Sequence, residues 1–147
     1  MTGLVFRRLR SLSEREVAGR LLADSRVPPA AIRNSGDTVL YGLWDLAAPA
    51  EEGLVAVAAT QPPDDAGSVE LCAIAIRADL RRRGLGRRLV TEVADALRAE
   101  GAARLVARLA GDHREAAALL ARAGFAATTD ADGQAAGTEV GWRYLAL

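Results

Sequence analysis

The sequence predicts an α/β fold of the α+β kind, built on a mixed sheet, and three observations support this prediction. Apolar, β-branched runs and amphipathic runs follow one another in the order β–α–α–β–β–β–α–β–α–β–β. The segment Val69–Glu100 reads as a strand, a turn rich in glycine and arginine, and a long helix, with a further strand after it. At 147 residues the chain suits one domain, 1–147, with a single core.

The N-terminal part predicts one strand and two helices. Leu4–Leu9 alternates weakly and is expected to be a strand. Ser13 and Glu16 have the spacing of a capping box, in which each side chain accepts a hydrogen bond from a free backbone N–H, so a helix is expected from here to about Ala23. Pro29–Arg33 is a candidate short second helix with proline near its first turn.

The middle of the chain predicts an antiparallel hairpin followed by a central strand. Thr38–Asp45 and Leu54–Thr60 are expected to pair as two strands with a long connection. Val69–Ile76 is apolar and β-branched apart from Glu70, which suits a strand buried on both faces. By strict alternation, Cys72 faces the same side of this strand as Glu70.

The C-terminal part predicts a βαβ unit and a closing pair of strands. The helix after the turn carries an apolar stripe at every fourth residue and is expected to end at Gly101. Arg104–Arg108 is the next strand, and a strand–helix–strand unit implies a parallel pair with a right-handed crossover. A helix over 111–123 and the strands Phe125–Thr129 and Val140–Leu145 complete the chain.

Composition limits the function classes. The 19 basic residues, all arginine, balance the 19 acidic ones, which argues against non-specific nucleic-acid binding. The single cysteine excludes an internal disulfide and suits a reducing compartment, and the single histidine excludes a histidine-rich metal site. No apolar run reaches membrane-spanning length and no signal peptide is visible, so a cytoplasmic protein without a membrane or metal partner is expected.

The turn before the long helix has the chemistry of an anion site. It comprises Arg81, Arg82, Arg83, Gly84, Leu85, Gly86 and Arg87. The first turn of a helix has free backbone N–H groups and a positive dipole end, and glycine lets ligand oxygens approach closely. Arginine adds forked donors that suit phosphate oxygens, so a pyrophosphate is a plausible ligand. A P-loop is excluded because the chain has no lysine, and a dinucleotide fingerprint is weak because Leu89 replaces its third glycine.

A third phosphate motif, Q/R-x-x-G-x-G/A between a strand and a helix, is matched by Arg81, Gly84 and Gly86. With the order of elements, this match resembles the GNAT superfamily of N-acetyltransferases over nearly the whole chain. The resemblance implies a mixed, mostly antiparallel sheet of six to seven strands, with two central parallel strands splayed apart and about four helices around it. It also implies acetyl-CoA as acyl donor, and direct acetyl transfer to an amine of a small molecule or peptide.

The resemblance assigns cofactor contacts. The central strand would pair its backbone with the peptide-like pantetheine arm through Ile74, Ala75 and Ile76. The turn residues 81–87 would hold the CoA pyrophosphate. His113 stands where the family usually has asparagine before its last helix, and is either a cofactor contact or an exposed first-turn residue.

The sequence marks the catalytic residues less clearly than the cofactor contacts. Glu70 stands where some family members have a general base, although it could instead sit at an open strand end in solvent. Leu120 occupies the place of the usual tyrosine acid, so Tyr144 on the last strand is the candidate acid. Cys72 is more simply explained as a small buried residue than as a nucleophile. The missing tyrosine leaves open a non-catalytic acyl-CoA-binding or regulatory module.

Two aromatic residues and the chain's last strands complete the predictions. Tyr41 and Trp44 would either line an acceptor pocket or pack in the core. The last strands offer a surface for a homodimer, which nothing in the sequence fixes.

Overall fold

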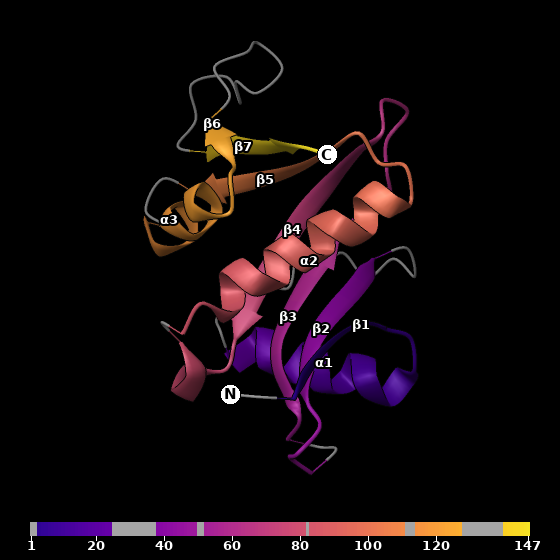
Figure 1. The fold of residues 1–147 in the computed structure, drawn as a ribbon, viewed down its shortest axis with the longest axis vertical. Coiled ribbons are helices and arrows are strands. Elements are labelled where there is room, and N and C mark those ends of the chain that lie inside the picture. The colour runs from indigo at the N-terminus through magenta and orange to yellow at the C-terminus, as the bar shows by residue number, and fades with distance from the viewer. Residues whose placement is uncertain (1–2, 25–37, 50–51, 82, 111–113, 128–139) are drawn as a thin grey trace.

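The computed structural model describes residues 3–24, 38–49, 52–81, 83–110, 114–127 and 140–147. Within these ranges one sheet has the strand order β1-β2-β3-β4-β5-β7-β6 (Figure 1). The strands are β1 (Leu4–Leu9), β2 (Val39–Asp45), β3 (Leu54–Thr60), β4 (Ser68–Ile76), β5 (Arg104–Ala110), β6 (Ala126–Ala127) and β7 (Val140–Ala146). The helices are α1 (Leu12–Asp24), α2 (Leu85–Ala99) and α3 (Arg114–Arg122), with a 3₁₀ helix at Ala78–Leu80.

Helices cover both faces of this sheet (Figure 1). On one face, Ala18 and Leu22 of α1 pack in a cluster with Val57 and Ala59 of β3. On the other face, α2 and α3 share a larger cluster to which β3 contributes Ala56 and Ala58. Every residue of β3 is therefore buried, as expected for a strand enclosed on both sides.

Helix α1 begins two residues earlier than the capping pattern predicts. The Ser11 hydroxyl accepts a hydrogen bond from the Glu14 N–H at 3.2 Å, and the Glu14 carboxylate accepts one from the Ser11 N–H at 3.1 Å. The predicted box at Ser13 and Glu16 is therefore wrong, because the same spacing recurs two residues upstream and Ser11 is the residue that precedes the helix. Hydrogen bonds to the Glu14 carboxylate, chiefly from Ser11, lower its pKa.

Helix α2 follows the predicted pattern. Its buried stripe comprises Leu85, Gly86, Leu89, Val90, Val93, Ala94 and Leu97. The helix ends at Ala99, and Gly101 follows with a φ of 91°, the left-handed conformation that favours glycine. This helix connects β4 to β5, and those two strands are parallel as the βαβ unit predicts.

The two central parallel strands stay paired only over the first part of β4. Their register runs from Ser68 opposite Arg104 to Leu71 opposite Ala107. Beyond that point β4 remains paired with β3, and β5 remains paired with β7 as far as Ala110. The strands therefore diverge toward the end of β4 that leads to α2, and Figure 1 shows β4 and β5 running apart. This confirms the splayed parallel pair.

A bulge in β4 changes which side chains face which helix. The pairing of β3 with β4 shifts register between Ala59 opposite Ala73 and Thr60 opposite Leu71. Before the shift, Leu71 packs in the cluster beneath α2; after it, Ala73 and Ala75 pack in the cluster beneath α1. Strict alternation along this strand, which placed Cys72 on the same side as Glu70, therefore does not hold across the bulge.

The remaining boundaries agree with the predictions to within two residues where the structure describes them. The hairpin of β2 and β3 is antiparallel as predicted. The predicted helix Pro29–Arg33 and the end of the strand Phe125–Thr129 lie outside the described residues. Among the helices that the structure describes, none combines the length and apolarity needed to cross a bilayer.

Candidate functional site

The start of α2 is open. Gly84 precedes the helix with a φ of 78° and offers no side-chain cap. The first intrahelical bond joins the Arg88 N–H to the Gly84 carbonyl at 3.1 Å. The N–H groups of Leu85, Gly86 and Arg87 therefore have no acceptor within the helix, and the described residues supply none. A Cβ built on Gly84 would meet no atom within 4 Å, so these amides border free space.

The two motif glycines have different roles. Gly86 is buried, and a Cβ there would lie 2.8 Å from Ile76 Cδ1 and 2.9 Å from Leu119 Cδ2. Its missing side chain thus allows α2 to pack closely on β4 and α3, whereas the sequence analysis assigned it to ligand approach. Gly84 is the glycine that faces open space.

Strand β4 directs backbone groups into the gap where β5 departs. The Arg77 N–H donates to the Val55 carbonyl at 2.9 Å, which marks a hydrogen-bonded antiparallel pair. Such pairs alternate along the ladder, so the backbone groups of Ala75 point toward β3, and those of Ile74 and Ile76 point away from it. Of the three predicted strand contacts, Ile74 and Ile76 therefore present N–H and C=O groups to the gap, and Ala75 does not.

Arginines surround the open helix start. Arg81, Arg83 and Arg87 are exposed, and none of them forms an ion pair within the described part of the chain. The Arg81 Nε donates to the Ile76 carbonyl at 3.3 Å, so the turn folds back on the end of β4. Arg82 lies outside the described residues.

A further arginine, which the sequence analysis did not single out, holds the connection between β4 and α2. Arg77 donates to the Asp79 carboxylate at 2.8 and 3.2 Å and to the Glu52 carbonyl at 2.8 Å. The hydrogen bond from Arg77 lowers the pKa of the Asp79 carboxyl. The bidentate pair orders the turn, and the bond to Glu52 ties the turn to the β2–β3 loop. The Arg-x-Asp spacing was the only sequence signal of the pair.

The two candidate catalytic residues, Glu70 and Tyr144, are placed by the pairing of their strands with β5. Glu70 is half-buried in the paired part of β4, opposite Val106 in register, and its carbonyl accepts hydrogen bonds from Gln61 N and Cys72 Sγ. Since Leu71 packs beneath α2, alternation directs the Glu70 side chain to the face that α1 covers. Tyr144 lies opposite Val106 on β7, so Glu70 and Tyr144 flank the same residue of β5.

Other predicted residues lie in the core or outside the described residues. Leu120, at the place of the family's tyrosine, is only 1% exposed. Tyr41 stacks on Phe6 with ring centroids 5.6 Å apart, and Trp44 is buried beneath the Arg7 guanidinium at 4.7 Å. His113 lies outside the described residues. No group of three or more metal-ligating side chains occurs among those that are described.

Residues 16–125 match the acetyltransferase (GNAT) family. The chain belongs to this family, and its diverging parallel strands are a feature that the sequence resemblance implied. None of the curated proteins compared with the chain matches it.

Solved structures share the fold. The ribosomal-protein-S18-alanine N-acetyltransferase of Escherichia coli is 21% identical with a TM-score of 0.72, covering 97% of this chain and 93% of its own. A GNAT family acetyltransferase of Elizabethkingia anophelis with acetyl-CoA bound is 16% identical with a TM-score of 0.77, covering 100% of both chains. The spermidine N-acetyltransferase of Vibrio cholerae, in complex with CoA and spermine, is 15% identical with a TM-score of 0.72, covering 99% and 96%. At these identities the likeness establishes the fold.

Proposed function

We propose that this protein is an acetyl-CoA-dependent N-acetyltransferase that acetylates a primary amine of a small molecule or peptide by direct attack. The open start of α2 beside the diverging end of β4 carries the proposal, because it places free N–H groups next to free strand groups. Similar structures contain acetyl-CoA, or CoA together with spermine, which supports both the donor and an amine acceptor.

The chain would hold the cofactor in two places. The amides of residues 85–87, with the guanidinium groups of residues 81–83 and 87, would bind the pyrophosphate. The backbone of Ile74 and Ile76 would pair with the amides of the pantetheine arm, satisfying strand groups that β5 leaves unpaired. Arg81 would give up or share its hydrogen bond to Ile76 when the arm binds. His113 would be a further contact.

When bound, acetyl-CoA supplies an acetyl group activated as a thioester. Glu70 would act as general base and accept a proton from the attacking amine, directly or through a water molecule. Tyr144 would act as general acid toward the leaving sulfur, because buried Leu120 has no proton to give. Both residues flank Val106, so the base and the acid would act across one strand.

Calorimetry with acetyl-CoA and CoA tests the cofactor, and thiol release with a panel of amines tests the reaction. The panel includes spermidine and a peptide with N-terminal alanine. We expect Glu70→Gln to lower kcat by about 100-fold or more without changing CoA affinity. Glu16→Gln on the exposed side of α1 is the matched control. No binding at millimolar cofactor by folded protein would refute the proposal.

A second function is favoured by one observation, the buried Leu120 at the position of the usual acid. A non-catalytic acyl-CoA-binding module would bind the cofactor, release no thiol with any amine of the panel, and be indifferent to Glu70→Gln. The cytoplasmic location, the single domain over 1–147 and a homodimer stay predictions of the sequence.

A further inference from the structure

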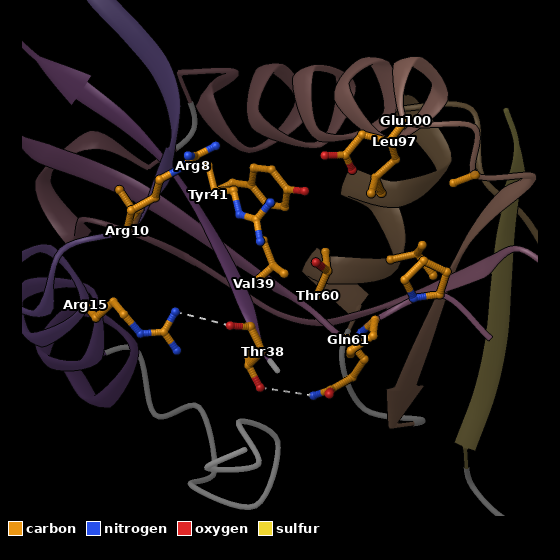
Figure 2. Close-up of a pocket in the computed structure, with 15 residues that line it drawn as sticks. Arg8, Arg10, Arg15, Thr38, Val39, Tyr41, Thr60, Gln61, Leu97 and Glu100 are labelled. Carbon is orange, nitrogen blue, oxygen red and sulfur yellow. Dashed lines mark hydrogen bonds between the residues drawn. The ribbon is translucent and has the colours of Figure 1, made fainter. Parts of the chain in front are cut away.

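A cavity of about 650 Å³ lies beside the C-terminal end of α2, away from the open helix start (Figure 2). Its volume is within the range of small-molecule sites. The ends of β1, β2 and β3 and the last turn of α2 line it. The 15 residues of α2 separate it from Gly84 by about 22 Å at 1.5 Å per residue. It is therefore distinct from the proposed pyrophosphate site.

One wall of this cavity is cationic. Arg8, Arg10 and Arg15 line it, as Figure 2 shows, and within the described chain none of them forms an ion pair with a carboxylate. By contrast, the neighbouring Arg7 pairs with Glu14 at 2.7 Å. Arg15 is held in place by a hydrogen bond from its Nη1 to the Thr38 carbonyl at 3.2 Å.

The rest of the lining that the structure describes is neutral apart from one acid, Glu100. Val39, Pro62 and Pro63 give it an apolar surface, whereas Val69 and Leu97 line it but are almost fully buried. Tyr41 is 3% exposed, and burial followed by the charge of Glu100 raises the pKa of its hydroxyl, which stays protonated and able to donate a hydrogen bond. The Glu100 carboxylate and the negative dipole end of α2 stand away from the arginines (Figure 2).

This separation of charge sets the orientation of a ligand. Among the described residues of the lining, three guanidinium groups against one carboxylate leave a positive balance, concentrated on the side of β1 and α1. An anionic head would be attracted to Arg8, Arg10 and Arg15 and repelled by Glu100. An apolar body would contact Val39 and the side chains beside it.

We propose that this cavity binds a small organic anion, with a carboxylate or phosphate head on the arginine wall and an apolar body over β2 and α2. The site is independent of acyl transfer, since it shares no residue with the start of α2 or the gap beside β4. Carboxylates and phosphate monoesters share the chemistry that the guanidinium groups recognise.

Calorimetry at low ionic strength with phenyl phosphate, benzoate, inorganic phosphate and benzyl alcohol tests this proposal on the full chain. We expect phenyl phosphate or benzoate to bind, and to bind more tightly than either inorganic phosphate or benzyl alcohol. The double variant R8A/R10A should lose about tenfold or more in affinity. Both side chains are exposed, so the variant should fold; R20A, an exposed arginine of α1 outside the cavity, is the control.

Three results would overturn the inference. They are equal affinity for benzyl alcohol and phenyl phosphate, an equal loss in R20A and R8A/R10A, and displacement of the probe by saturating CoA. The double variant should bind CoA as the parent does. A result that overturns the anion site therefore leaves the acyltransferase proposal unaffected, and a result that overturns the acyltransferase proposal leaves the anion site unaffected.

Discussion

Replacing Gly84 by glutamate tests the placement of the pyrophosphate most directly. The residue has a φ of 78°, and a Cβ there would meet nothing within 4 Å. The substitution therefore costs backbone strain of about 1–2 kcal/mol and no overpacking. A carboxylate next to the helix N-terminus is electrostatically favourable in the free protein, which offsets part of that strain.

The loss of cofactor affinity follows from charge. The new carboxylate would stand in the space that the uncapped amides border, which is the space proposed for the phosphate. Two like charges at a separation of roughly 5 Å repel each other by about 1–3 kcal/mol for an effective dielectric between water and a protein surface. This corresponds to a loss of about 5- to 150-fold in affinity, before any steric displacement of the ligand is added.

Calorimetric titration of acetyl-CoA measures this loss, and Gly101 provides a matched control at the other end of the same helix. Gly101 has a φ of 91° and the same open surroundings, so Gly101→Glu introduces the same residue with similar strain. We expect only Gly84→Glu to weaken binding. If the two variants bind acetyl-CoA equally well while folded, the pyrophosphate does not sit at the start of α2.

Four further predictions concern stability and are checked by urea unfolding. Ser11→Ala should lower the free energy of unfolding by about 1 kcal/mol, whereas Ser13→Ala should have little effect, because Ser11 caps α1. Since the folded-state pKa of Glu14 is lowered, its stabilising contribution should be complete above about pH 4.3, the unfolded-state pKa, and decline as the pH falls further; Glu14→Gln should flatten that part of the profile. Gly86→Val should cost about 1–3 kcal/mol or more by overpacking, and Leu89→Ala about 2–5 kcal/mol by leaving a cavity at a fully buried position.

Much of this architecture was predictable because its signals are local. The stripe of α2 repeats every fourth residue and stops at Gly101, so composition and spacing fix the helix without reference to the rest of the chain. The apolar run Val69–Ile76 indicates an inner strand of the sheet, although alternate side chains from Glu70 to Ile76 are only half-buried and not enclosed on both faces as expected. A helix between two strands implies their parallel pairing. The arginine and glycine turn marks the candidate anion site for the same reason, since its motif is local to residues 81–87.

Other features depend on contacts that spacing does not encode. The bulge between Leu71 and Ala73 arises from how β4 pairs with β3, and no glycine or proline at this place in the sequence indicates it. Ser11 and Ser13 both have the spacing of a cap, and the hydrogen bonds that make Ser11 the cap depend on where the backbone enters the helix. The cationic cavity gathers Arg8, Arg10 and Arg15 with a helix end some 85 residues later in the chain, so only the fold brings its walls together.

The short pairing between β4 and β5 divides the sheet into two parts that few backbone hydrogen bonds connect. Four residue pairs, from Ser68–Arg104 to Leu71–Ala107, connect β1–β4 to the remaining strands. A peptide-like molecule bound between β4 and β5 beyond these pairs would take the place of a strand and make the connection between the two parts more rigid. Hydrogen exchange should report this: the amides of Ile74 and Ile76 should exchange faster than those of Ala73 and Ala75 in the free protein, and slow selectively when acetyl-CoA is added.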